Sequence, residues 1–372
     1  MAGLGQLSVE LHTEILRHAL LYSRRPTRFS TPLRPSLEWI DDPRDRGGFP
    51  FNVALTCSFW RDILACIPEC WTRLVFDVTA DPFPILSAFT WTNSLQDIEV
   101  FIVTSAMESV EVEKALEKER VKSVVDALQP HIHRCSSIVV DVMHEASLPS
   151  SLIFFTQNAP CLHTLTLKFR EKERECNDEI YRHRINAFRI PDPKLATSFP
   201  RLHHVTMYGE GFFELCMFDR ADEWLKELKT SQDLHLHLAR FRFLHDLEVD
   251  DYITVADLTL SLSKLRHLQS LHLQDVRLEY TDPPYPEMAF VTSGLLHELD
   301  LSDLHFEDVS RDFLSEFFTT APCYGERTTF TRCAIPRISQ PIYGCILTLD
   351  SIIPDEIINE DGFREQRPDR LL

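Results

Sequence analysis

Glycine is scarce in this chain, with 10 glycines among 372 residues, which is under half the average usage of roughly 7%. Loops that cradle phosphate groups need glycine where the backbone approaches the ligand. The segment Gly209-Glu210-Gly211 lacks the third glycine of a dinucleotide-binding loop, and no Gly-Lys-Ser/Thr sequence occurs. We therefore expect no nucleotide and no other cofactor.

Basic residues are also in short supply. The 38 lysines and arginines are outnumbered by 57 aspartates and glutamates, which gives a formal net charge of −19 at pH 7. Nucleic-acid binding depends on concentrated positive charge, and so does attraction to anionic membranes. Nucleic acids and membranes are therefore not expected as partners, and other proteins are.

Long apolar runs and a secretory signal are missing as well. No run approaches the roughly 18 apolar residues of a membrane-spanning helix. The first seven residues do not combine a basic stretch with an apolar one. These absences predict a cytoplasmic or nuclear protein whose ten cysteines are reduced thiols.

Motifs that carry catalysis are absent, since neither Gly-x-Ser-x-Gly nor His-Glu-x-x-His occurs. The segment His131-Ile132-His133-Arg134-Cys135 contains zinc-ligand residue types, but no second Cys/His pair lies at a usual spacing, so capping or packing is its expected role. Cys66 and Cys70 are separated by the helix-breaking Pro68. We expect no catalytic residues, no metal site and no enzymatic activity.

The N-terminal segment predicts an amphipathic helix that begins after Ser8, a favourable N-cap residue. Leu11 and Ile15 lie one helical turn apart with Leu16 beside them, which gives a wide apolar stripe. Residues 24–50 are rich in proline, arginine, aspartate and glycine. This composition predicts an exposed loop.

A second helix is expected over residues 52–64. Its apolar residues lie on two faces, Val53, Cys57, Trp60 and Leu64 on one and Leu55, Phe59 and Ile63 on the other. Because both faces need cover, we expect the chain itself to cover one and a partner to cover the other. Pro68 ends the helical segment, and Trp71 precedes a strand-like run over residues 72–78.

Three short motifs follow one another here: Leu-x-x-Glu-Leu-x-x-x-Ile-Leu from Leu7, Cys-x-x-Trp-Arg-x-Ile from Cys57, and Ile-Pro-x-x-Trp-x-x-Leu from Ile67. Together they resemble an F-box, particularly the loop-expanded form common in mushroom-forming fungi. The chain departs from the family at Ser8, where proline is usual, and in the long insertion between the helices.

The resemblance implies docking to the Skp-type adaptor of an SCF-type cullin–RING ubiquitin ligase. The residues that it implies for adaptor binding are Leu7, Leu11, Ile15, Leu16, Val53, Cys57, Trp60, Arg61, Ile63, Pro68 and Trp71. The alternative is that these helices only form the core of an N-terminal cap on the domain that follows.

Beyond residue 75 the chain returns repeatedly to the pattern Leu-x-x-Leu-x-Leu or a close variant. Copies start at residues 162, 202, 244, 268 and 296, and degraded copies lie at 95–100 and 138–142. Helix-like segments lie between them, at 115–128, 152–155, 255–265 and 313–318. This alternation predicts an irregular leucine-rich-repeat-like solenoid with a parallel sheet, as many F-box proteins carry, while an ordinary α/β domain is the alternative.

The predicted fold class is therefore α/β, in three parts. A helical F-box-like module spans residues 1–75 and includes the loop at 24–50, the solenoid spans 76–350, and a polar tail spans 351–372. The function expected is a substrate receptor of the ubiquitin ligase, and its rival is a non-catalytic leucine-rich-repeat scaffold without ligase association.

A target protein is expected on the concave face of the solenoid. Alternate residues of each strand motif point to that face, which makes it polar, rich in histidine and partly acidic. A basic peptide or protein would suit it, while a solvated face without a target is the alternative. The target-binding residues expected there are His163, His204, Glu248, His272, Glu298 and Asp300.

Overall fold

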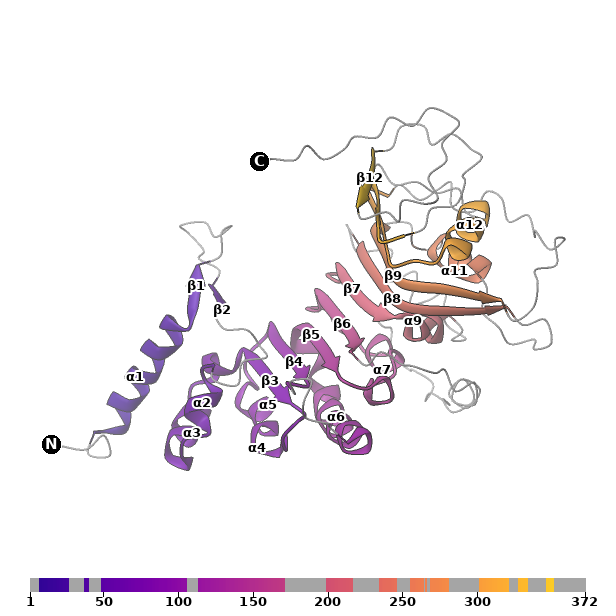
Figure 1. Ribbon diagram of the computed structural model, residues 1–372. Helices are drawn as coiled ribbons and strands as arrows, with labels where there is room; N and C mark the ends of the chain where they lie inside the picture. Colours follow the sequence, from indigo (N-terminus) through magenta and orange to yellow (C-terminus); the bar gives the residue numbers. More distant parts are fainter. Residues whose placement is uncertain are drawn as a thin grey trace, which may run out of the picture. The chain divides into compact units, whose positions relative to one another are not determined.

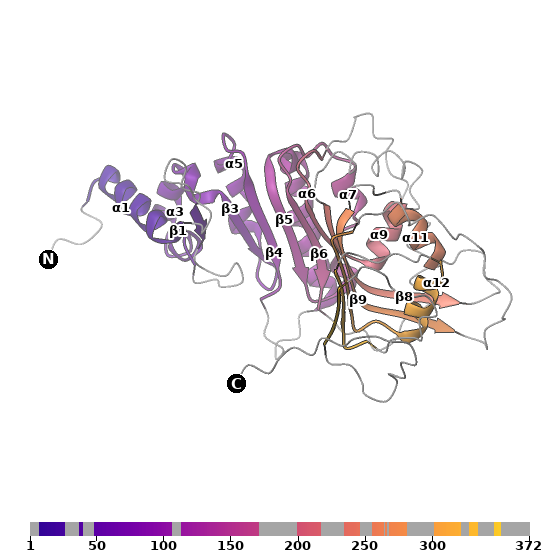
Figure 2. The ribbon, with the colours of Figure 1, turned by 90° about the horizontal axis from the view of Figure 1, so that it is seen from above.

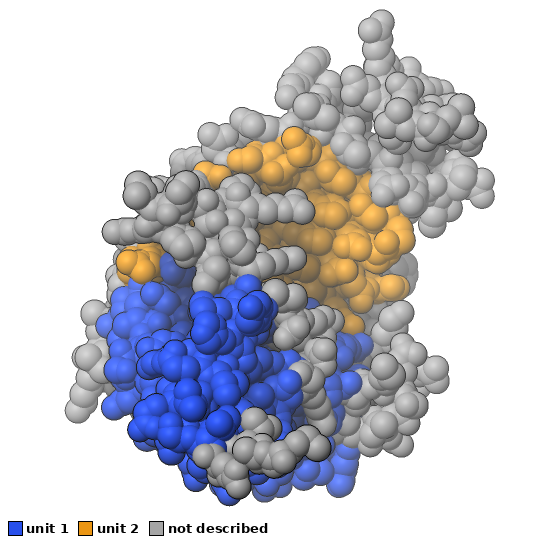
Figure 3. Space-filling view, turned by 90° about the vertical axis from the view of Figure 1, so that its left-hand side faces the viewer, with its two compact units in different colours: residues 1–149, 157–191 blue, residues 150–156, 192–372 orange. Residues whose placement is uncertain are grey.

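The structure is a computed structural model, and the chain divides into two compact units (Figure 3). The first unit consists of Met1–Pro149 and Gln157–Pro191, and the second of Ser150–Thr156 and Asp192–Leu372. The residues that the structure describes are 7–26, 37–39, 48–105, 113–170, 199–216, 234–245, 255–263, 265, 268–280, 301–320, 327–333 and 346–350.

The first unit begins with helix α1 (Val9–Tyr22), and Ser8 holds the N-cap position in an extended conformation, as predicted. One face of α1 is buried, and its buried residues His12, Leu16 and Leu20 follow each other at intervals of four. Residues four apart lie one above the other on a helix. The helix is therefore amphipathic, with a buried side and a solvent side.

The segment between α1 and the next helix was expected to be an exposed loop. It contains a short antiparallel pair, β1 (Arg24–Pro26) and β2 (Leu37–Trp39). Arg24 donates hydrogen bonds from Nη2 to the main-chain oxygen of Glu69 (3.2 Å) and to Oγ1 of Thr72. The start of this segment is thus tied to the chain around residue 70.

Two helices, α2 (Phe51–Ala54) and α3 (Ser58–Ala65), replace the single helix expected over residues 52–64. The prediction of one helix is wrong because Cys57 is extended, with φ −161° and ψ 161°, and forms the N-cap of α3. The hydroxyl of Thr56 donates to the main-chain oxygen of Asn52 (2.8 Å) just before the break. Such local hydrogen bonds compete with helix continuation.

A short 3-10 helix, η2 (Pro68–Trp71), connects these helices to the parallel strands of the first unit. Its last residue, Trp71, is fully buried. The indole contacts Phe51 and Trp91, with ring centroids 6.0 Å and 4.7 Å away. The helical segment therefore shares a core with the α/β part of the first unit.

Four parallel strands form the sheet of the first unit, and each pairs with the next in sequence order. They are β3 (Arg73–Asp77), β4 (Ile98–Val103), β5 (Cys135–Val142) and β6 (Thr164–Phe169). The connections contain α4 (Phe83–Leu86), α5 (Ala88–Trp91), α6 (Lys114–Leu128), η3 (Gln129–Arg134) and η4 (Glu145–Ser147). Figure 1 shows α4, α5 and α6 along the same side of these strands.

The second unit repeats this arrangement of parallel strands joined by helices (Figure 2). Its strands are β7 (His204–Tyr208), β8 (Leu234–His245), β9 (Leu268–Tyr280), β10 (Asp303–Glu307), β11 (Arg327–Thr331) and β12 (Ile346–Asp350). Its helices are α7 (Leu152–Phe155), α9 (Gly209–Cys216), α11 (Val255–Ser263) and α12 (Arg311–Thr320).

Burial alternates along much of the strands of both units, although β5 ends on three consecutive buried residues. In β10, Leu304 and Phe306 are buried, while His305 and Glu307 are partly exposed. A period of two means that, in the part of the chain that the structure describes, helices cover one face of the sheet and leave the other open. Most all-parallel sheets are covered on both faces, so this open face is unusual. The predicted α/β class with a parallel sheet is confirmed.

The connecting helices supply the cover for the buried face. In the second unit, Phe317 of α12 meets Phe306 of β10 edge-on at 5.7 Å, and Phe306 stacks on Phe330 of β11 at 5.2 Å. In the first unit, Val121, Val124, Val125 and Leu128 of α6 are buried as well. Among the described helices none is both long and apolar enough to span a bilayer.

Candidate functional site

An apolar stripe is exposed on α1 and just before it. Leu7, Leu11 and Ile15 follow each other at intervals of four and are 36%, 53% and 42% exposed. We call these three residues the α1 stripe. Leu55, the C-cap residue of α2, and Phe59 of α3 are exposed as well. Contiguous exposed apolar surface often marks an interaction site.

Phe59 connects α3 to the buried side of α1 through His12. The imidazole of His12 is 1% exposed and lies edge-on to Phe59 and Trp60, with ring centroids at 5.1 Å and 5.2 Å. Neither ring nitrogen of His12 has a hydrogen-bond partner among the described residues. A buried polar group without a partner destabilises the folded state, so the contact between α1 and α3 is weaker than its aromatic packing alone suggests.

The residues expected to bind an adaptor fall into three groups by exposure. Leu7, Leu11, Ile15 and Cys57 are exposed, and Val53, Trp60, Arg61 and Pro68 are partly exposed. The other three, Leu16, Ile63 and Trp71, are buried in the first unit. The exposed group can touch a partner directly, whereas the buried group positions the helices that carry it.

The structure describes three of the six residues expected to bind a target. His163 directly precedes β6 and is partly exposed, His204 of β7 is exposed, and His272 of β9 is partly exposed. Glu248, Glu298 and Asp300 lie outside the described residues. His204 and His272 both lie on the open face of the second unit's sheet, since their strand neighbours are buried.

Histidines form a row across neighbouring strands on this open face. His237 of β8, His272 of β9 and His305 of β10 occupy the same register position. Neighbouring rings stack with centroids 4.2 Å apart and planes within 11°. His204 of β7 and His235 of β8 stack in the same way at 4.8 Å.

The sequence carries a recurring signal for this row, a histidine between two large apolar residues. It appears as Leu236-His237-Leu238, Leu271-His272-Leu273 and Leu304-His305-Phe306. The apolar neighbours point to the helix-covered face, so each histidine points to the open face. His305 and Glu307 are not among the residues expected from the sequence, and the repeated triplet is the signal that finds His305.

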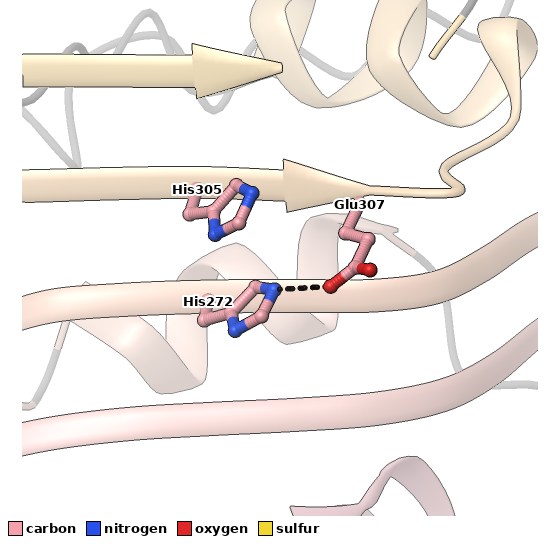
Figure 4. Close-up of side chains that lie close together, drawn as sticks. All are labelled: His272, His305 and Glu307. Atoms are coloured by element: carbon pink, nitrogen blue, oxygen red, sulfur yellow. Dashed lines mark ion pairs between the residues drawn. The ribbon is translucent and has the colours of Figure 1, made fainter. Parts of the chain in front are cut away.

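Glu307 directs its carboxylate toward His272 of the neighbouring strand (Figure 4). Oε2 of Glu307 lies 3.3 Å from Nε2 of His272, while Oε1 accepts a hydrogen bond of 2.5 Å from Nη2 of Arg332. Burial and the neighbouring His237 and His305 lower the pKa of His272 to about 3. The His272 ring is therefore neutral near pH 7.

The His131–Cys135 segment has the packing role expected from the sequence. His131 stacks on Phe89 at 5.2 Å, and its Nδ1 lies 2.8 Å from Nη2 of Arg134. Nη2 of Arg134 also donates to the main-chain oxygen of Phe89 (3.3 Å), which stabilises the end of α5. Burial raises the pKa of the Cys135 thiol to about 12, so it stays protonated and is a poor metal ligand.

Two other motifs from the sequence also have structural roles. Burial raises the pKa of the Cys70 thiol to about 12, and Cys66 is exposed, so the pair does not form a buried thiolate site. Gly211 lies in α9, where an added Cβ would come within 2.8 Å of Cε1 of Tyr208. Close packing, rather than a phosphate, therefore explains this glycine.

Comparison with known proteins does not identify the chain. No protein-family model matches it, and no curated protein is significantly similar to it.

Proposed function

We propose that the chain is a substrate-receptor subunit of an SCF-type cullin–RING ubiquitin ligase. Its N-terminal helices dock on a Skp-type adaptor, and its open sheet face holds a target protein. The observation that carries the proposal is the exposed α1 stripe, which falls on the first of the three F-box-like motifs. Burying one such side chain contributes about 1.5–3 kcal/mol, so a partner that covers Leu11 and Ile15 gains substantial free energy.

The proposed module extends from α1 to η2. The second and third motifs contain Cys57 and Trp60, which are at least partly exposed, and the buried Trp71. Only surface residues contact an adaptor in this proposal. Leu16, Ile63 and Trp71 hold α1, α3 and η2 in the arrangement that presents that surface.

The proposed target-binding part is a leucine-rich-repeat-like solenoid. In the described part of the chain, helices lie between successive strands, such as α9 after β7, α11 after β8 and α12 after β10, and buried leucines alternate with partly exposed residues along these strands. A sheet covered on one face only is typical of solenoids whose other face binds a partner. The target is a protein or peptide with basic residues, because the chain is strongly acidic.

The chain contributes no catalytic group of its own in this proposal. The ligase complex carries out ubiquitin transfer, and the receptor accelerates it by holding the target close to the transferring enzyme. Specificity therefore depends on the sheet surface, and ligase association depends on α1 to η2.

A second function is supported by a different observation, the burial of Trp71 against Phe51 and Trp91. A shared core of this kind suits a scaffold protein whose N-terminal helices only cap the first strand. This scaffold would bind proteins without joining a ubiquitin ligase. It predicts that deletion of residues 1–71 unfolds the first unit and that no adaptor binds.

Co-purification tests the receptor proposal directly. Full-length chain carrying Leu11→Asp together with Trp60→Ala is expressed with a tagged Skp-type adaptor. The receptor proposal predicts that the wild-type chain co-purifies and that the variant is lost from the adaptor fraction while its circular dichroism spectrum is unchanged. Equal recovery of both chains contradicts the docking assignment, and recovery of neither favours the scaffold.

A further inference from the structure

We propose that His272, His305 and Glu307 form a binding site for a divalent transition-metal ion, Zn²⁺ foremost, on the open face of the second unit's sheet (Figure 4). Each residue offers one ligand atom, and these atoms all lie within 4.8 Å of one another. Two imidazoles and a carboxylate are a ligand set that proteins use for zinc. The site is independent of adaptor docking.

The backbone holds the three ligands in a fixed relationship. His272 and His305 are register partners on the parallel strands β9 and β10, and Glu307 follows two residues after His305 on the same face. Main-chain hydrogen bonds between the strands fix the separation of the Cα atoms. The ion therefore needs only side-chain movement to bind, and no rearrangement of the sheet.

The distances are close to those of a zinc site. Zinc bonds of about 2.0–2.2 Å in tetrahedral geometry place neighbouring ligand atoms roughly 3.3 Å apart. Nε2 of His272 and Oε2 of Glu307 already lie 3.3 Å apart. His305 has to turn its ring toward them, because its Nε2 makes a 3.0 Å hydrogen bond with Oγ1 of Thr331.

The His272 ring is available to an ion. Its Nε2 is buried and lacks a hydrogen-bond partner among the described residues, since the approach of Glu307 is without hydrogen-bond geometry. An ion at this position would satisfy a nitrogen that otherwise costs free energy.

The charges around the cluster are compatible with a cation. Arg332 donates to Oε1 of Glu307 (2.5 Å) and to Oδ2 of Asp308 (2.6 Å). This leaves Oε2 of Glu307 free to face the ion, and outer hydrogen bonds of this kind orient metal ligands. Arg332 thus pairs with two carboxylates, those of Glu307 and Asp308, and does not neutralise Glu307 alone.

Imidazole ligands favour Zn²⁺, Ni²⁺ and Cu²⁺ over Mg²⁺ and Ca²⁺, which prefer oxygen ligands in larger number. Three protein ligands leave a fourth position of a tetrahedral ion open. Because all three residues are partly exposed, water or a donor group of a bound protein can supply the fourth ligand. A plain stack of neutral imidazoles is the competing explanation.

Calorimetric titration of the metal-free full-length chain with Zn²⁺ tests the proposal. We expect one saturable site, with affinity lowered more than about tenfold in His272→Gln and in His305→Gln. Mg²⁺ should not compete. The matched control is His204→Gln, which removes a stacked histidine of the same sheet face outside the cluster and should bind Zn²⁺ like the wild-type chain.

Circular dichroism of each variant without metal establishes that the variants fold, and Glu307→Gln gives a third ligand test. Weaker binding in the three ligand variants with unchanged binding in His204→Gln supports the site. Unchanged affinity in His272→Gln and His305→Gln overturns it, because zinc then binds elsewhere, for instance at cysteines. Absence of saturable binding in the wild-type chain overturns it as well.

Discussion

The indole Nε1 of Trp71 donates a hydrogen bond of 3.0 Å to the main-chain oxygen of Leu64 in the last turn of α3. Through this bond the buried Trp71 fixes α3, and through its ring contact with Trp91 it connects α3 to α5. The surface proposed for adaptor docking therefore depends on an aromatic residue that also packs in the α/β part of the first unit.

Replacing Trp71 tests that connection. Trp71→Ala should lower the free energy of unfolding of the first unit by about 3–5 kcal/mol, because a large buried side chain leaves a cavity. Trp71→Phe loses the hydrogen bond to Leu64 and part of the side-chain volume, and it should lower the free energy of unfolding by less. Urea unfolding and hydrogen exchange at α3 measure both effects. Native-like protection of α3 in Trp71→Ala would contradict the assigned role.

Glu117 of α6 provides a second stability test. Its fully buried carboxylate accepts hydrogen bonds from the main-chain nitrogens of Met143 (2.8 Å) and His144 (3.0 Å) and from the hydroxyl of Thr104. Hydrogen bonds to a charged group contribute about 1.5–3 kcal/mol. Glu117→Gln should therefore lower the urea midpoint, since an amide supplies only one acceptor oxygen.

The exposed Glu119 on the same helix is the control for that change. Glu119→Gln should leave the urea midpoint unchanged. Equal midpoints for both variants would mean that the hydrogen bonds of Glu117 contribute nothing net.

Replacement of His12 should change stability in the opposite direction, by raising the free energy of unfolding. Because both ring nitrogens are buried without described partners, His12→Leu removes a desolvation penalty and should raise the free energy of unfolding by about 1 kcal/mol. His18→Leu on the exposed side of the same helix is the matched control and should leave it unchanged. A destabilised His12→Leu, measured by thermal unfolding, would show that the edge-on contacts with Phe59 and Trp60 outweigh the penalty.

The pKa of His272 predicts a pH dependence in the absence of metal. The unfolded chain takes up a proton as the pH falls through the ordinary value of 6.5, whereas the folded ring, surrounded by His237, His305 and Glu307, does so only near about 3. Stability contributed by neutral His272 is therefore complete above pH 6.5 and is lost progressively as the pH falls toward 3.

Thermal unfolding at a series of pH values, with a chelator present, measures this effect. The wild-type midpoint should fall more steeply below pH 6.5 than that of His272→Gln, which has no ring to protonate. Parallel curves for the two chains would show that His272 titrates normally in the folded protein.

Much of the fold was predictable because its elements have strong local patterns. The apolar pattern over residues 115–128 predicted α6 within a residue of its bounds, and the N-cap at Ser8 predicted where α1 begins. The break at Cys57 was not predictable, because apolar residues on two faces suit one long helix as well as two short ones. Tertiary packing, including the contacts of His12 with Phe59 and Trp60, fixes the observed arrangement.

The two candidate sites also differ in how far the local sequence pattern reveals them. The α1 stripe follows from a spacing of four residues, which the sequence displays directly. The cluster of His272, His305 and Glu307 depends on the register between β9 and β10. A strand register depends on pairing between residues far apart in the sequence, so the sequence displays the histidine triplet but not its alignment with the neighbouring strand.

The most direct test of the receptor proposal is the affinity of a purified Skp-type adaptor for the full-length chain and for Leu11→Asp/Ile15→Asp, measured by calorimetry. The control is Leu116→Asp, which changes an exposed leucine of α6 in the same unit. We predict saturable one-to-one binding that the double variant weakens on the order of 100-fold, since two side chains lose about 1.5 kcal/mol of burial each, while the control binds normally. Equal affinity of the double variant and the wild-type chain, or no binding by either, would contradict the proposal.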